Sequence, residues 1–518
     1  MMLPALTNRA NFFRNRRGRY VAGGVLLVLL CVVLLLLKSC ATTPEKETLD
    51  RFRPAMKPEF ESQLDGLTQA PRYAIDIRLD PKLDVLSGQA TVRVVNTSAD
   101  AWPNLVFRLY PMLGQYGGKM TFQSVAIGNQ PMPYVNLADN SAIRVNLPEP
   151  LAPQEKTEVR LAWKLDIPEW SDSSNAYALL GKSQAMLSLP LFYPTLAVYM
   201  PGPIAGAGHW WLDEGDVRGD AALNVTSLFV VTATLPSDQI PVTSGTLITS
   251  TLLGKNLARH VWVTGPSREF LLHTSTQFSS ASADAYGTRI TSYWLPGQDA
   301  AGKAALNYAV AALRIYSDRF GPYPYRDLRI APAALSYRSM EYPQAGLLGT
   351  ELYTLFRNNL ESIVARSVAH QWWYQVIGSD PVNEPWLDES LAEYSAKLYT
   401  EELYGKTAAD ELQTRQWQGP FDALKQQNGD AAINQPVRSF VSSTQYETIM
   451  YAKGALFYDT VRKTMGDPQF TRFLQDYLQK YRYQIVGSEQ WLALLHALNN
   501  PALDKLYQTW VQASSNKP

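Results

Sequence analysis

Apolar and polar residues alternate along the first half of the chain, whereas the second half repeats apolar residues at helical spacing. The alternation has a period of two and is clearest in Tyr73–Asp80, Ala90–Ser98, Thr157–Ile167, Ser227–Pro236 and Arg259–Gly265. This period predicts strands with one buried face, and the turn residues between the segments favour short connections. We therefore expect residues 71–265 to form an antiparallel β-sandwich or saddle.

From residue 266 onwards the pattern is mainly helical. Long helices are predicted over Ala301–Phe320, Asn359–Gly378 and Glu384–Leu403, and short amphipathic helices follow between Phe470 and Val511. The chain is therefore expected to be an α+β multidomain protein, with a β-domain at 71–265 and a mainly helical domain at 266–518.

The N-terminus has the features of a membrane anchor. Residues 1–19 contain five arginines and no acidic residue, and the run from Val21 to Leu37 is apolar throughout. A helix of this length spans about 26 Å, enough for a thin bilayer. We expect a cytoplasmic tail at 1–19, a transmembrane helix at 20–38, a tether at 39–70 and an extracytoplasmic remainder. The alternatives are a cleaved signal peptide and a lipoprotein signal that ends at Cys40.

Charge and cysteine content narrow the classes of partner and site. The 47 basic and 47 acidic residues cancel, so no net charge attracts nucleic acid. Both cysteines, Cys31 and Cys40, lie in or beside the apolar N-terminal run, which leaves no thiol for a disulfide or a metal site elsewhere. A histidine-based metal site must therefore draw on only five histidines.

Four short motifs appear in order in the helical half. They are FGPYPY at 320–325, SMEYP at 339–343, AHQWW at 369–373 followed by WLDES at 386–390, and YETIMYAKG at 446–454. In this order they resemble the gluzincin zinc aminopeptidases, the family of membrane alanine aminopeptidase and leukotriene hydrolase. The resemblance implies an N-terminal β-domain and a thermolysin-like domain that a small helical bundle closes.

The resemblance also implies roles for residues that recognise a peptide. Glu341 matches the acid that binds the N-terminal ammonium group of the substrate, in an edge strand that also contains Met340. Tyr451 matches the tyrosine that hydrogen-bonds the oxyanion of the tetrahedral intermediate, and Tyr446 matches a second tyrosine of the cleft.

The metal site departs from the family pattern at two positions. In the family motif H-E-x-x-H, two histidines and a glutamate from the next helix hold zinc, and the intervening glutamate is the general base. His370 and Glu389 match two of the ligands, but Arg366 stands at the other histidine position and Ser367 at that of the base. A guanidinium cannot be a ligand, and a serine hydroxyl does not accept a proton near neutral pH. We therefore expect no zinc cofactor, and an Arg366–Glu389 contact in its place.

These features predict a membrane-anchored, extracytoplasmic protein that binds peptide or protein N-termini without cleaving them. The first alternative is an active zinc aminopeptidase, in which case zinc is bound after all. The second alternative is a structural subunit of an envelope complex with an unused cleft. Nucleic acid is not an expected partner.

Overall fold

The computed structural model describes residues 49–170, 179–183, 185–204, 206–214, 218–335 and 338–512. The chain divides into two compact units, Met1–Asp50 and Arg51–Pro518. The predicted cytoplasmic tail and transmembrane helix lie outside the described residues. Across the described ranges, no helix is long and apolar enough to cross a bilayer.

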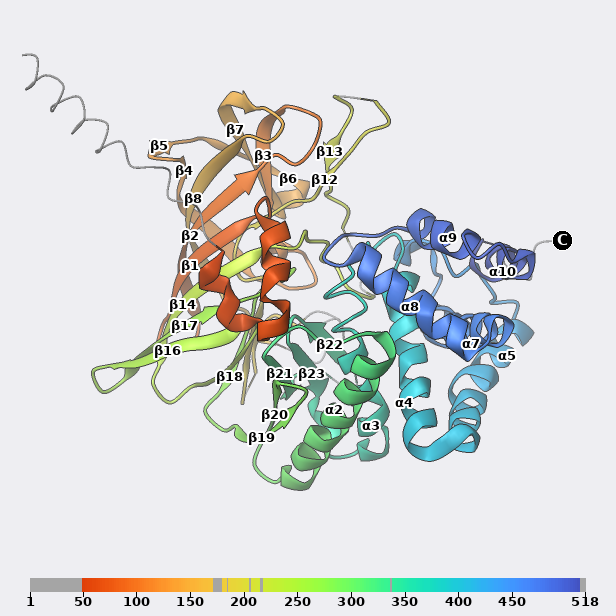
Figure 1. The fold of residues 1–518 in the computed structure, drawn as a ribbon. Coiled ribbons are helices and arrows are strands. Elements are labelled where there is room, and N and C mark those ends of the chain that lie inside the picture. Colours follow the sequence, from red (N-terminus) through yellow and green to blue (C-terminus); the bar gives the residue numbers. More distant parts are fainter. Residues whose placement is uncertain are drawn as a thin grey trace, which may run out of the picture. The chain divides into compact units, whose positions relative to one another are not determined.

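An eight-stranded sheet dominates the first part of the larger unit, with the strand order β16-β17-β14-β1-β2-β8-β4-β5 (Figure 1). Strand β1 pairs in parallel with β14, so the sheet is mixed and the prediction of a purely antiparallel sheet is wrong at this pair. The bounds are β1 (Arg72–Leu79), β2 (Val85–Val95), β4 (Lys119–Ile127), β5 (Gln130–Pro131), β8 (Lys156–Asp166), β14 (Leu228–Pro236), β16 (Thr246–Leu253) and β17 (Leu257–Val263).

Two four-stranded sheets share one apolar core with the large sheet. Trp163 of the large sheet, Leu105 of β3 and Leu187 of β10 belong to a single buried cluster, which is the core that the alternating pattern predicts. The orders are β15-β18-β10-β9 and β11-β3-β7-β6, and β12 pairs with β13. The bounds are β3 (Trp102–Arg108), β6 (Tyr134–Leu137), β7 (Ala142–Leu151), β9 (Gly181–Lys182), β10 (Leu187–Pro190), β11 (Thr195–Leu196), β12 (Tyr199–Met200), β13 (His209–Trp210), β15 (Ile240–Thr243) and β18 (Leu271–Ser275).

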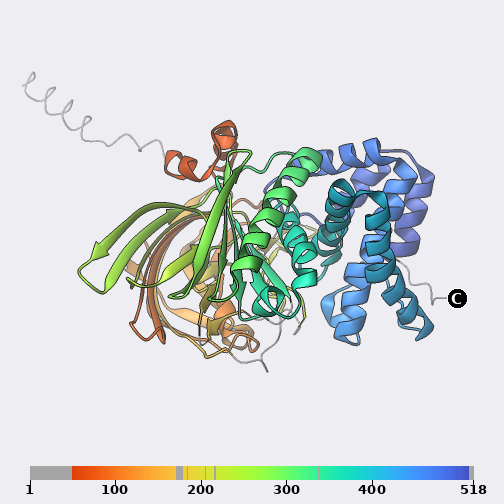
Figure 2. The ribbon, with the colours of Figure 1, turned by 90° about the horizontal axis from the view of Figure 1, so that it is seen from below.

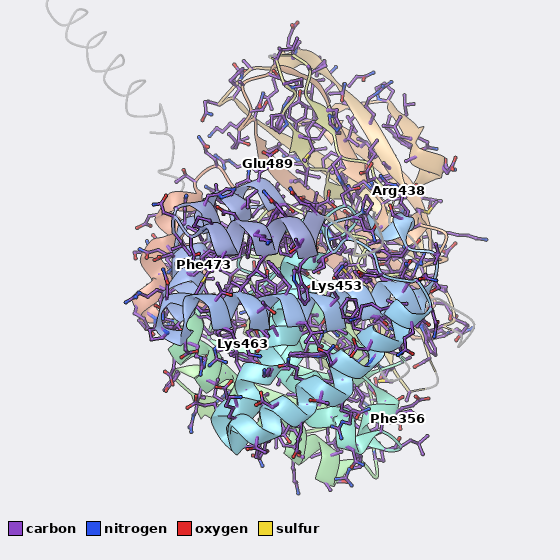
Figure 3. All side chains as sticks on the ribbon, turned by 90° about the vertical axis from the view of Figure 1, so that its right-hand side faces the viewer. Phe356, Arg438, Lys453, Lys463, Phe473 and Glu489 are labelled. Carbon is purple, nitrogen blue, oxygen red and sulfur yellow. The ribbon has the colours of Figure 1, made fainter. Side chains whose placement is uncertain are left out.

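A five-stranded sheet opens the second part, and helices gather beside it (Figure 2). Its order is β19-β20-β21-β23-β22, and β22 is therefore an edge strand. The strands are β19 (Ser279–Ala285), β20 (Thr288–Trp294), β21 (Asp327–Ala333), β22 (Ser339–Tyr342) and β23 (Ala345–Gly349). The helices are α2 (Asp299–Phe320), α3 (Leu360–Ala369), α4 (Trp386–Leu412), α5 (Gly419–Gln426), α6 (Ser443–Glu447), α7 (Gly454–Met465), α8 (Asp467–Tyr481), α9 (Ser488–His496) and α10 (Pro501–Leu506), and the blue helices near the C-terminus face the viewer in Figure 3.

Short 3-10 and π-helical segments complete the secondary structure. The 3-10 segments are η1 (Asp50–Ala55), η2 (Pro58–Leu67), η3 (Tyr110–Met112), η4 (Ala138–Asn140), η5 (Thr350–Tyr353), η6 (Arg357–Asn359) and η8 (Val437–Ser439). The π-helical segments are η7 (Gln413–Gln418), η9 (Thr448–Lys453) and η10 (Tyr507–Gln512).

Two predicted domain boundaries differ from the structure. The second half of the expected tether is folded, because the Arg326 Nε donates to the Met56 carbonyl at 2.6 Å and the Tyr483 hydroxyl donates to Gln63 at 2.7 Å. The β-domain also extends past residue 265, since β18 pairs with β10 and β15. Both differences come from long-range pairing, which local composition does not reveal.

The helix that carries the histidine motif is shorter than predicted. Helix α3 ends at Ala369 rather than near Gly378, and Tyr374 adopts a φ of 100° in the turn that follows. The carbonyl of Tyr374 accepts a hydrogen bond of 2.6 Å from Arg268, so a distant side chain holds this strained turn. Helix α4 begins at Trp386, directly after Pro385, and a kink at Gly405, with φ 82° and ψ 171°, interrupts it close to the predicted end at Leu403; a second helical stretch continues to Leu412.

Candidate active site

Helices α3 and α4 bring the two predicted metal ligands together. His370 follows the last residue of α3 and is 3% exposed, and Glu389 lies in the first turn of α4. The His370 Nε2 lies 3.5 Å from the Glu389 Oε2, and the His370 Nδ1 lies 3.9 Å from Asp388. His370 and Glu389 therefore lie side by side in the buried space between α3 and α4.

Arg366 lies one turn before His370 and fills the space beside Glu389. Its Nη2 donates to the Glu389 Oε2 at 2.5 Å, and its Nε lies 3.7 Å from Glu393. The guanidinium carbon also lies 4.5 Å from the centre of the Tyr451 ring, a cation–π distance. The predicted Arg366–Glu389 contact is confirmed.

Burial and neighbouring charges set the protonation of this cluster. Burial opposes the charged forms, but Arg366 and His370 outweigh it and lower the pKa of Glu389 to about 2. Burial would also lower the pKa of His370, yet the charges of Glu341 and Glu389 raise it to about 9. Burial and the charge of Glu389 raise the pKa of Asp388 to about 7. At neutral pH the site thus holds an ionised Glu389 between two cations.

The position of the general base is sealed from solvent. Ser367 is 0% exposed, and among the described residues its Oγ has no hydrogen-bond partner. Gly346 of β23 lies directly against it, because a Cβ atom at that glycine would come within 2.2 Å of the Ser367 Oγ. A serine hydroxyl does not accept a proton near neutral pH, and this one is not exposed to solvent.

The predicted recognition strand is an edge strand, as expected. Glu341 of β22 pairs with Gly346 of β23 and leaves the other side of the strand without a neighbour in the sheet. Its Oε1 is buried without a hydrogen-bond partner in the described part of the chain. Met340 is only 7% exposed and therefore packs in the core.

The two predicted tyrosines lie close to each other, and one of them contacts Arg366. Tyr446 in α6 is fully buried, Tyr451 belongs to η9, and their ring centres lie 6.1 Å apart. Tyr451 turns its ring face to Arg366, which places it at the site as predicted.

A loop of the β-domain supplies an acid that no sequence motif indicates. A Cβ atom at Gly219, whose φ is 69°, would come within 2.7 Å of the Tyr446 Oη, and Arg218 donates to the Phe440 carbonyl at 2.9 Å. The next residue, Asp220, has a pKa well above its usual range because of burial and the charges of Glu389 and neighbouring acids. In the sequence, Asp220 is marked only by a short Arg-Gly-Asp stretch in a region without regular secondary structure.

Residues 304–510 match the model of the peptidase family M1 domain. They form a peptidase family M1 domain. This confirms the resemblance to the gluzincin aminopeptidases. Aminopeptidase M1-C of Oryza sativa is 25% identical over 241 residues, which is 44% of this chain and 27% of the relative. Leukotriene A-4 hydrolase of Xenopus laevis is 22% identical over 220 residues, 40% of this chain and 35% of that protein. The matched region thus spans about a quarter to a third of these relatives.

Solved structures share the fold over most of the chain. The M1 zinc metallopeptidase from Deinococcus radiodurans superposes with a TM-score of 0.67 at 18% sequence identity. The aligned region covers 87% of this chain and 95% of the metallopeptidase chain. A point mutant of that metallopeptidase, bound to a Tyr-ser-ala substrate, has a TM-score of 0.66 at 20% identity, with the same coverage. These similarities show that the chain shares the fold of those two structures over most of its length.

The donor set of this M1 domain does not fit zinc. A zinc site needs at least three protein ligands, and only His370 and Glu389 stand at ligand positions. The third position holds a guanidinium that already donates to Glu389. Within the described ranges, no group of three or more His, Cys, Asp or Glu side chains is arranged to hold a metal ion.

Proposed function

We propose that this protein is a non-catalytic member of peptidase family M1 that binds the N-termini of peptides. The Arg366–Glu389 ion pair is the observation that carries the proposal. Two like unit charges 4 Å apart repel each other by about 4 kcal/mol at an effective dielectric constant of 20. The repulsion between a divalent cation and a guanidinium at that distance is about twice as large. A zinc ion bound to Glu389 would have to displace Arg366, or its binding would be weakened by this repulsion.

Recognition of an amine is supported by the excess of acid in the cleft. Five carboxylates face two cations, and burial together with mutual repulsion raises the pKa of Asp220 and of Asp388. An ammonium group would supply the missing positive charge, with Glu341 and Asp220, which interact electrostatically with each other, as its acceptors. The acids are Asp220, Glu341, Asp388, Glu389 and Glu393, and the cations are Arg366 and His370.

The backbone of the peptide would add to the edge strand β22. An extended segment that joins a sheet edge gains main-chain hydrogen bonds and no sequence specificity from them. A structural neighbour is described as bound to a Tyr-ser-ala substrate, so a tripeptide is a suitable probe.

Calorimetric titration with Tyr-Ser-Ala and its N-acetylated form tests the proposal. We expect the free amine to bind at least about tenfold more tightly, since acetylation removes the charge. Glu341→Gln should abolish this preference, whereas Glu489→Gln on the exposed surface of α9 should not (Figure 3). Equal binding of the two peptides, or no binding of either, would remove the recognition claim.

One assay on the purified protein and one in cells separate the two alternative functions. Turnover of aminoacyl chromogenic substrates that chelators abolish would show an active zinc aminopeptidase. A cellular phenotype of gene loss that Glu341→Ala fully complements would favour a structural subunit.

We further propose that the apolar run Val21–Leu37 anchors the protein in a membrane, with the M1 domain outside the cytoplasm. Carbonate extraction and protease accessibility in intact cells test this. We expect the full chain in the membrane pellet and its C-terminus on the extracytoplasmic side. Release by carbonate would contradict the anchor.

A further inference from the structure

Strand β16 is an edge of the eight-stranded sheet and is unusually apolar for such a position. All of its residues after Thr246 are exposed, and four of them are large and apolar. These are Leu247 at 46%, Ile248 at 43%, Leu252 at 71% and Leu253 at 45% exposure. A long apolar edge strand presents unpaired backbone groups and apolar side chains together, which makes it a template for another strand.

Three other edge strands of this fold contain a proline or a charged residue. The opposite edge of the same sheet, β5, has only two residues, one of them Pro131. Strand β15 contains Pro241, and β19 contains Asp284. In contrast, no ionisable residue lies between Asp238 and Lys255, a stretch that includes all of β16. Proline, charge, short length and bulges are common means of blocking edge pairing. Strand β16 has a bulge between Leu247 and Thr249, but its remaining part, Thr249–Leu253, has no bulge, proline or charge.

We propose that β16 pairs with β16 of a second copy of this chain, antiparallel and about a twofold axis. An uncharged partner strand suits an uncharged edge, and an identical strand is always available at equal concentration. The pairing would join two eight-stranded sheets into one continuous sheet, as isologous dimers do.

The β-bulge in β16 fixes the register of this pairing. Its pairing with β17 shifts between Leu247 and Thr249, so the regular part of the strand is Thr249–Leu253. A twofold axis through the middle of this part sets Thr251 opposite Thr251 of the second copy, and Ser250 opposite Leu252. Threonine pairs favour such cross-strand contacts. The two Leu252 side chains then lie diagonally on one face, about 7 Å apart, and shield each other from water.

The mass of the full chain in detergent tests the dimer. Analytical ultracentrifugation should give about twice 57.9 kDa for the protein component. Thr251→Lys puts like charges directly opposite each other and should raise the dimer dissociation constant at least about tenfold. Gln89→Lys adds the same charge to an exposed position of the inner strand β2 and should leave the mass unchanged.

Two further measurements test the twofold register. Thr251→Lys and Thr251→Glu chains should each be monomeric but should form a mixed dimer, because the opposed charges become complementary. In a chain with Cys31 and Cys40 replaced by serine, Thr251→Cys should cross-link to itself on oxidation more than Thr249→Cys does. A monomeric wild type, or a dimer that Thr251→Lys leaves intact, would overturn the proposal.

Discussion

At the scale of single residues, the character of the site depends on Arg366. Its charge compensates Glu389 within a buried cluster, so that the metal-ligand position of the family becomes an internal ion pair. A buried pair of this kind adds little net stability by itself, but removal of one partner leaves the other charge unpaired. The residue therefore fixes both the chemistry of the site and the way the site responds to mutation.

Arg366→Met should lower the free energy of unfolding by about 3 kcal/mol, because buried Glu389 then loses the closer of its two cations and keeps only His370 at 3.5 Å. Arg53→Met is the matched control, since Arg53 pairs with Glu61 and Asp65 at the surface. Its loss should cost about 1 kcal/mol or less. Urea unfolding measures both, and equal effects of the two substitutions would contradict the buried ion pair.

Glu269 gives the protein a pH-dependent stability that is separate from the metal-ligand residues. Burial raises its pKa to about 8, although Arg268 opposes this. Between pH 4.5 and 8 the folded chain keeps a proton that the unfolded chain has lost, so stability falls as the pH rises. The fall should be on the order of 4 kcal/mol and should be reduced in Glu269→Gln. Urea midpoints at about pH 5 and pH 8 measure it, and equal pH slopes in both proteins would contradict this account.

At the scale of elements, Arg268 ties together three segments that are distant in sequence. It donates to the carbonyls of Tyr374 at 2.6 Å, Asn224 at 3.0 Å and Gln484 at 2.7 Å, and it is almost completely buried. These bonds hold the turn after α3 and so determine where His370 stands. A guanidinium suits this role because its donors point in three fixed directions.

Arg268→Lys should therefore destabilise the protein by about 3 kcal/mol, since a lysine leaves buried carbonyls unsatisfied. Arg259→Lys, at an exposed pair with Asp76, is the control and should change the unfolding free energy by less than about 0.5 kcal/mol. Thermal unfolding of both variants provides the comparison. A stable Arg268→Lys variant would show that the three bonds are dispensable.

The sequence predicts those elements that local pattern determines. The five alternating segments coincide with β1, β2, β8, β14 and β17 within a few residues, because a buried sheet face imposes a period of two. The end of α3 at Ala369 could not be predicted from the local sequence, because Arg268 of the β-domain holds the turn that follows α3. Asp220 escapes it as well, because its place in the cleft depends on the packing of Gly219 against Tyr446.

At the scale of the whole molecule, the proposed recognition site is shared between domains. Asp220 comes from the β-domain, whereas Glu341 and the ion pair come from the M1 domain. Neither domain alone would complete the acid cluster, so the proposed binding of an amine depends on how the two domains pack. The proposed dimer strand β16 lies in the β-domain, at the far end of the large sheet from β5 (Figure 1).

Asp220→Asn should weaken the binding of Tyr-Ser-Ala about tenfold and leave N-acetylated peptide unaffected, because an amide, unlike the carboxyl group of Asp220, cannot lose a proton to become an anion beside the ammonium group. Asp238→Asn, at an exposed position of the same domain, is the control. Unchanged affinity in Asp220→Asn would remove the β-domain from the recognition site.

The metal content of the full chain after a chelator wash tests the central claim most directly. We predict about one-tenth of an equivalent of zinc or less, because a cation of the chain itself occupies the ligand position. The same measurement on the double variant Arg366→His/Ser367→Glu, which restores the motif of the family, shows whether the fold can still bind zinc. About one tightly bound zinc per unmodified chain, together with hydrolysis of aminoacyl substrates, would contradict the account.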